Sequence, residues 1–184
     1  MNLRPRSQPW ADPVSKRASL RDFQEDLANR LKAAAAESAP SARLSFEAGD
    51  SRWLLRLDSS GEVLTVPEIS RVPLTRDWFL GVANVRGVLF GVSDFAAFLG
   101  GAATATGADN RLLLIGQPHG VNIALLVTRL AGLRNLGELE ALNDGEEIST
   151  WASGAWRDGE GRIWHELDSA RLLTHRDFLD VALH

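Results

Sequence analysis

The chain has 184 residues, enough for one or two small domains that bury a core without disulfides. It contains no cysteine, which excludes a disulfide framework and thiolate chemistry, and its net charge of -4 argues against nucleic acid as the main partner. No apolar run approaches the ~20 residues of a membrane-spanning helix, and no apolar signal core follows Arg4 and Arg6. We therefore expect a cytoplasmic protein without direct membrane insertion.

The N-terminal part of the chain divides into a tail and a helix. Residues 1–18 contain three prolines and four basic residues without apolar periodicity, which predicts a disordered tail. Residues 19–38 are predicted to form a helix, which Ser19 caps and Pro40 stops. Its apolar stripe consists of Leu20, Phe23, Leu27 and Leu31. We expect the stripe to pack on the chain's own domain, with docking on a partner as the alternative.

After Arg43 the apolar periodicity changes from helical to extended. Short apolar runs between turn residues, at intervals of roughly ten residues, indicate an all-β barrel or sandwich. The predicted strands cover residues 44–46, 52–58, 62–66, 78–87, 88–92, 111–116, 121–128, 148–156 and 162–167. Short helices are predicted over 95–99, 169–173 and 178–183, and a flexible loop over 101–107. Residues 130–142 fit either a helix or an irregular link.

An internal repeat is visible in two segments that end at an aspartate. Residues 87–94 and 161–168 both run from a glycine to an aspartate seven positions later, and a short apolar segment follows each. Asp94 and Asp168 occupy the position where a carboxylate accepts backbone N–H bonds at the start of a helix. The repeat predicts two similar small barrels, each closing with a strand and a short helix.

Motifs for chemistry are absent from the sequence. It has no phosphate-binding loop, no dinucleotide fingerprint and no nucleophile elbow, and its four dispersed histidines lack metal-ligand spacing. We therefore expect no cofactor and no metal. One alternative remains open, an all-β enzyme or small-ligand domain with a site near His165, Glu166 and Asp168. The strand period, however, puts His165 and Glu166 on opposite faces.

The stretch from Val66 to Gly100 is apolar and carries very few titratable groups, which favours a binding surface over a catalytic pocket. Arg86 stands out because it lies among apolar strand residues, next to Gly87. Two interpretations have equal weight: a surface arginine at the end of a strand, or an interface residue of the kind enriched at binding hot spots.

This stretch resembles the CheW-like domain family. The matching pattern is V-x-E-I, V-P, F-L-G-V-x-N-[LV]-R-G-x-L and V-x-D before a short helix. The residues are Val66, Glu68, Ile69, Val72, Pro73, Phe79, Leu80, Gly81, Val82, Asn84, Val85, Arg86, Gly87, Leu89, Val92 and Asp94. Residues 123–134 and 161–168 are also similar to the family, in the same order, so that the resemblance covers roughly residues 40–175.

The resemblance implies a mainly β fold of two five-stranded β-barrels packed side by side, at residues 40–180, with the N-terminal helix as an addition. It also implies a non-catalytic adaptor that joins the regulatory domain of a CheA-type histidine kinase to the cytoplasmic tip of a chemoreceptor, recruited to membrane receptor arrays. The sequence looks most like the PilI-type members, which serve type IV pili and twitching motility, with a flagellar chemotaxis adaptor as the alternative. The implied partner-binding residues are Val66, Glu68, Gly81, Asn84, Arg86 and Gly87.

The sequence departs from the family pattern at several positions, which could alter the kinase and receptor surfaces. Thr128 stands where the family often has aspartate, Val85 where it often has leucine, and Ser93 where an apolar residue precedes the capping aspartate. The link between Ile69 and Val72 is also shorter than in chemotaxis adaptors. A further alternative is therefore an adaptor-like domain that binds only the kinase or itself.

Overall fold

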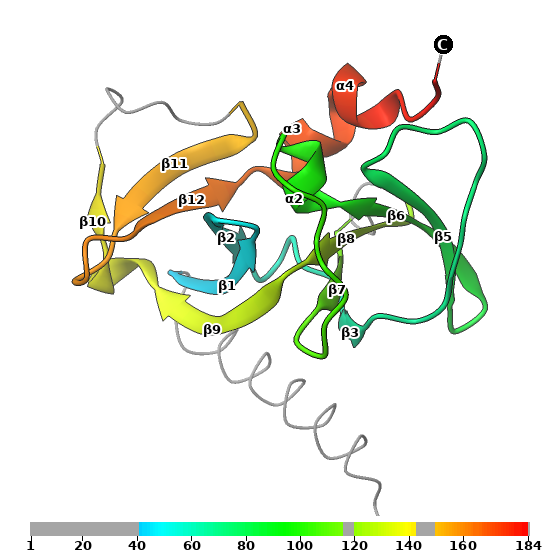
Figure 1. Ribbon diagram of the computed structural model, residues 1–184. Coiled ribbons are helices and arrows are strands. Elements are labelled where there is room, and N and C mark those ends of the chain that lie inside the picture. Colours follow the sequence, from blue (N-terminus) through cyan, green and yellow to red (C-terminus); the bar gives the residue numbers. More distant parts are fainter. Residues whose placement is uncertain (1–40, 116–119, 143–149, 184) are drawn as a thin grey trace, which may run out of the picture.

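The computed structural model describes residues 41–115, 120–142 and 150–183, which form two curled sheets side by side (Figure 1). The predicted tail and N-terminal helix lie outside these residues. Barrel 1 has the strand order β10-β11-β12-β2-β1-β9, and barrel 2 has the order β3-β7-β8-β6-β5-β4. The strands of barrel 1 are β1 (Ala42–Ala48), β2 (Ser51–Arg56), β9 (Arg129–Asn135), β10 (Glu140–Ala141), β11 (Ala152–Arg157) and β12 (Ile163–Leu167). Those of barrel 2 are β3 (Val63–Thr65), β4 (Ile69–Ser70), β5 (Phe79–Val85), β6 (Val88–Asp94), β7 (Arg111–Leu114) and β8 (Ile123–Val127).

The internal repeat is confirmed by the topology. β6 pairs antiparallel with β5 and parallel with β8, and β12 pairs in the same way with β11 and β2. Asp94 caps α2 (Phe95–Phe98) and Asp168 caps α3 (Ser169–Thr174), with side chains that accept N–H bonds at 3.2 and 2.9 Å. The backbone N–H of each aspartate also donates to the carbonyl of a tryptophan that precedes the hairpin, Trp78 or Trp151.

Two expectations about the sheets are corrected. Within residues 41–115, 120–142 and 150–183, each sheet has six strands where five were expected, and each includes a two-residue edge strand, β4 or β10. The segment 130–142 is neither a helix nor an irregular link, because most of it forms β9, the 3-10 helix η2 (Leu136–Glu138) and β10. The alternation of inward and outward side chains in this segment is interrupted, because the β1–β9 register shifts beside Gly132. The φ of Gly132 is 100°, a backbone conformation that glycine adopts readily.

The two barrels share one apolar core, and barrel 2 has a second core of its own. Residues from both sheets, such as Phe46, Trp53, Leu113 and Leu125, are buried together with Phe95 of α2 in the shared core. The interior of barrel 2 holds Ala83, Phe90, Val92, Leu112, Leu114, Ala124 and Leu126. Because these side chains alternate with those of the shared core along β7 and β8, the inner strands of barrel 2 are buried on both faces.

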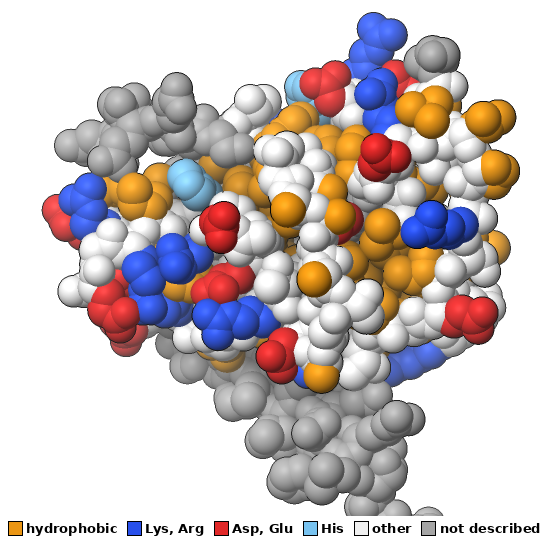
Figure 2. Space-filling model, viewed as in Figure 1, with side chains coloured by type: hydrophobic (Ala, Val, Ile, Leu, Met, Phe, Trp, Pro, Cys, Tyr) orange, Lys and Arg blue, Asp and Glu red, His pale blue; other side chains and the backbone are white. Residues whose placement is uncertain are grey.

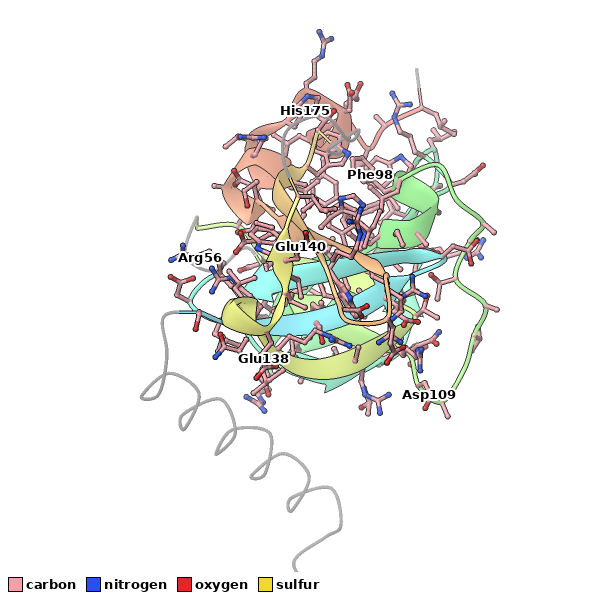
Figure 3. The ribbon with its side chains drawn as sticks, turned by 90° about the vertical axis from the view of Figure 1, so that its left-hand side faces the viewer. Arg56, Phe98, Asp109, Glu138, Glu140 and His175 are labelled. Atoms are coloured by element: carbon pink, nitrogen blue, oxygen red, sulfur yellow. The ribbon has the colours of Figure 1, made fainter. Side chains whose placement is uncertain are left out.

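Aromatic side chains fix the C-terminal helices over the junction of the barrels. Phe178 of α4 (Arg176–Leu179) stacks on Trp78, and Phe98 lies against both Phe178 and Trp151. Trp151 in turn packs against His175, and Figure 3 shows Phe98 and His175 at the same end of the molecule. The predicted helix over 178–183 is wrong, because α4 begins earlier and ends at Leu179, after which the chain pairs with the segment 74–76.

The face of barrel 1 that is turned away from the shared core is closed by polar contacts. Arg43 and Glu166 form a buried ion pair there. The Trp164 indole donates to Asp158 at 3.0 Å, and the guanidinium of Arg134 lies 4.2 Å from the centre of the Trp164 ring. Since Arg134 belongs to the edge strand β9 and Trp164 to β12, on the far side of β1 and β2, this cation–π contact requires the sheet to curl.

Candidate functional site

The β5–β6 hairpin of barrel 2 carries most of the sequence-predicted partner-binding residues. Val85 pairs with Val88, so Arg86 and Gly87 form a two-residue turn, with φ values of 52° and 87°. Two positive φ angles match the I′ geometry that tight hairpins prefer. Asn84 supports the turn, because its side-chain oxygen accepts the Gly87 N–H at 2.8 Å. The conformation of the Asn84–Gly87 segment, at the end of the hairpin, is therefore set by contacts among its own residues.

Arg86 forms a two-pronged ion pair with Glu62, just before β3. Its Nη1 donates to Glu62 Oε2 at 2.9 Å, and its Nη2 donates to Oε1. The Arg86 side chain is 67% exposed and that of Glu62 is 28% exposed. Of the two interpretations, a surface arginine in an ion pair at the end of a strand therefore describes the geometry of Arg86. Contact between Arg86 and a partner protein stays a prediction.

Gly81 lies beneath the surface and has a structural role. Its φ is 129°, it sits at an irregularity in the β5–β6 register, and a Cβ there would lie 2.1 Å from the carbonyl oxygen of Ser70. Glycine at this position lets β4 pair closely with β5, as the Ser70–Val82 register requires. Gly81 is buried, so it affects an outer surface through the position of β4.

A groove of about 390 Å³ on the outer face of barrel 2 brings together two of the predicted residues, Glu68 and Asn84. One wall comes from the segment around β4 and the other from the hairpin; the lining residues are Pro67, Glu68, Ser70, Val82, Asn84 and Leu89. Leu89 is 61% exposed, and Val66 and Val88 are also exposed large hydrophobics. Sequence reasoning did not select Val82 and Leu89, although their alternation with buried Ala83 and Phe90 places them on the outer face.

The two barrels differ in their exposed surface. Figure 2 shows hydrophobic side chains spread over the half of the molecule that contains β5 and β6, whereas basic and acidic side chains gather over barrel 1. Part of that charge is a two-pronged Arg129–Glu47 pair, with N···O distances of 2.7 and 2.9 Å. Hydrogen bonding from Arg129 lowers the pKa of the Glu47 carboxyl despite the opposing effect of burial. On the side shown in Figure 2, barrel 2 therefore exposes more apolar surface than barrel 1.

A second, larger hollow of about 850 Å³ opens at the junction of the barrels. It lies between the β1–β2 turn, the loop after α2, Thr128 and His165. Thr104 fixes this loop, because its backbone N–H and hydroxyl donate to Asp94 at 2.7 and 2.8 Å. His165 packs against Trp53, and burial lowers the pKa of its imidazole, which favours the neutral ring.

The residues of the alternative enzymatic site do not converge. His165 faces Trp53, Glu166 lies on the opposite face with Arg43, and Asp168 caps α3. Across residues 41–115, 120–142 and 150–183, no three His, Cys, Asp or Glu side chains are grouped to hold a metal ion. The geometry therefore gives His165, Glu166 and Asp168 separate structural contacts.

In the same described part of the chain, no helix has the length and apolarity to cross a bilayer.

The fold agrees with what comparisons with known proteins show. The chain belongs to the CheW-like domain family, whose model matches residues 43–177. It is 27% identical over 149 residues to protein PilI of Pseudomonas aeruginosa, covering 76% of this chain and 79% of that relative. The crystal structure of the scaffolding protein TtCheW from Thermoanaerobacter tengcongensis has the same fold, with a TM-score of 0.59 at 18% identity, over 71% of this chain and 90% of that one. The family resemblance in the sequence is thereby confirmed.

Proposed function

We propose that this chain is a non-catalytic chemosensory adaptor that couples a methyl-accepting chemoreceptor to the regulatory domain of a CheA-type histidine kinase. Membership of the CheW-like family supports this role, and the similarity to a PilI protein favours type IV pilus and twitching control. The adaptor acts through geometry: the receptor's conformation biases kinase activity because both proteins bind the same scaffold.

The observation that carries the proposal is the groove between β4 and the β5–β6 hairpin, in which apolar and polar side chains lie together. It presents Leu89 and Val82 with a single carboxylate, that of Glu68, among its lining residues. An exposed apolar side chain flanked by polar groups is the arrangement found at the centre of protein interfaces. The groove therefore fits a protein partner, and we assign it to the kinase regulatory domain.

Calorimetric titration with the cognate kinase regulatory domain tests this assignment through Leu89→Glu. We expect affinity to fall by about ten-fold or more, because a charge would replace an exposed apolar anchor. Leu179→Glu is the matched control, since Leu179 is 50% exposed at the end of α4, away from the hairpin. Unchanged affinity of a folded Leu89→Glu variant would remove the groove from the kinase interface.

The pilus and flagellar roles are separated in cells. Deleting the gene should reduce twitching while leaving swimming intact, and the full chain should restore twitching. A fluorescent fusion should co-localise with receptor arrays and become diffuse when the receptor is deleted. Loss of swimming with normal twitching would instead favour the flagellar adaptor.

A further inference from the structure

The Arg86–Glu62 pair joins the two walls of the groove. Glu62 begins the segment that runs through β3 to Pro67 and Glu68, which form one wall, and Arg86 is in the hairpin that forms the other. In the sheet, β7 and β8 separate β3 from the hairpin. The ion pair is therefore a direct link across barrel 2 between two segments that are not neighbouring strands.

The geometry of Arg86 restricts what else its side chain can do. The backbone at residue 86 has positive φ, which is uncommon for a residue other than glycine, and the turn is held by Asn84. Both terminal nitrogens of the guanidinium already donate to Glu62. Two parallel N–H···O bonds fix the direction of the guanidinium and strengthen its attraction to the carboxylate.

Barrel 1 uses the same kind of link with the charges exchanged. Asp158, in the β11–β12 hairpin loop, lies 3.8 Å from Arg134 of the edge strand β9. Two strands, β1 and β2, again separate the hairpin from that edge strand. An arginine–carboxylate link from a hairpin to the opposite edge of the sheet thus occurs in both barrels. Because it recurs, we connect this link with the curling of each sheet into a barrel as well as with the groove.

We infer that Glu62 and Arg86 act together as positioning residues, whose ion pair holds the two walls of the groove at the spacing that the kinase recognises. On this inference Arg86 influences binding through Glu62 and not by contact with the partner. It deepens the proposed function and rests on it, because the groove is taken as the kinase-binding surface. Exposed ion pairs are individually weak, so the expected effects are modest.

A charge-exchange series tests the inference by titration against the kinase regulatory domain. We expect Glu62→Ala and Arg86→Ala to weaken binding equally, by about three-fold. The double variant Glu62→Arg/Arg86→Glu should recover affinity close to that of the unaltered chain, although it reverses the charge at the hairpin. Arg129→Ala is the matched control, because it breaks a two-pronged pair with Glu47 on barrel 1.

Hydrogen exchange provides a readout that does not depend on the kinase. The amides of β3, Val66 and Glu68 should exchange faster in both single variants and return to normal in the double variant. The inference is overturned if Glu62→Ala binds normally while Arg86→Ala binds weakly, or if the double variant binds as poorly as Arg86→Ala. If the unaltered chain does not bind the kinase domain, the proposed function fails, and exchange alone then decides whether the pair holds the walls together.

Discussion

Barrels 1 and 2 share one pattern of strand pairing but differ in what fills them. The interior of barrel 2 is apolar, with Phe90 and Val92 at its centre. The corresponding face of barrel 1 buries the Arg43–Glu166 pair and places Asp158 against the Trp164 indole. Figure 3 looks onto barrel 1, with Glu138 of η2 and Glu140 of β10 labelled on its outer strands.

The difference shows that one topology can be closed in two physical ways. Apolar packing in barrel 2 is non-directional and leaves the outer face of β5 and β6 available for a partner. Barrel 1 depends on charged hydrogen bonds, which are directional and costly when only one member remains. The two barrels should therefore respond differently to core truncation, to loss of one charge and to acid.

Truncating the apolar centre of barrel 2 should have the largest effect. Phe90 is 2% exposed, so Phe90→Ala removes a buried ring and leaves a cavity. We expect the free energy of unfolding to fall by about 4 kcal/mol, as for other buried phenylalanines. Urea denaturation measures this loss, and a loss below about 1 kcal/mol would show that barrel 2 does not depend on its interior.

Removing one member of the buried ion pair should have a slightly smaller effect in barrel 1. Glu166→Ala removes the buried carboxylate that accepts from the Arg43 Nε, at an expected cost of about 3 kcal/mol by the same denaturation measurement. Ser153, whose hydroxyl lies 3.2 Å from Glu166, also loses an acceptor.

The matched control replaces both charges with apolar residues. Arg43→Met/Glu166→Met should recover most of the stability, because it removes the desolvation cost together with the attraction. If the double variant is less stable than Glu166→Ala, barrel 1 requires the charged pair itself, and the contrast between the barrels becomes sharper.

Acid should produce the smallest of these effects and should act on barrel 1. Burial alone would raise the pKa of Asp158, but hydrogen bonds from Trp164, from the Arg162 side chain and from backbone N–H groups outweigh it and hold that pKa well below its usual range. A depressed folded-state pKa stabilises the fold above the unfolded value of about 3.9, and this stability is lost as pH falls below it. The urea midpoint should therefore fall less between pH 5 and 3 in Asp158→Asn than in the unaltered chain. An equal fall in both proteins would show that Asp158 is not the source of this acid sensitivity.

Local patterns predicted a large part of this fold. The capping aspartates and the Gly-to-Asp repeat lie within a few residues of the helices they start, and the structure confirms both caps. The turn at Arg86 and Gly87 was missed, because both residues were placed in a strand over 78–87, although Asn84 and glycine define the turn locally. The segment 130–142 was mispredicted because the shift beside Gly132 breaks its alternation, and only pairing with β1 identifies it as a strand.

The sequence by itself determined the β-rich class, the starts of α2 and α3, the pair of similar barrels and the family, because each depends on neighbouring residues or on a dense motif. Only the tertiary structure decided that Glu166 is buried against Arg43, which is 123 positions away, and that Arg86 is held by Glu62. It also decided that Val82 and Leu89 face outward into one groove with Glu68. These contacts depend on how the sheets curl, a property of many distant strand pairings together.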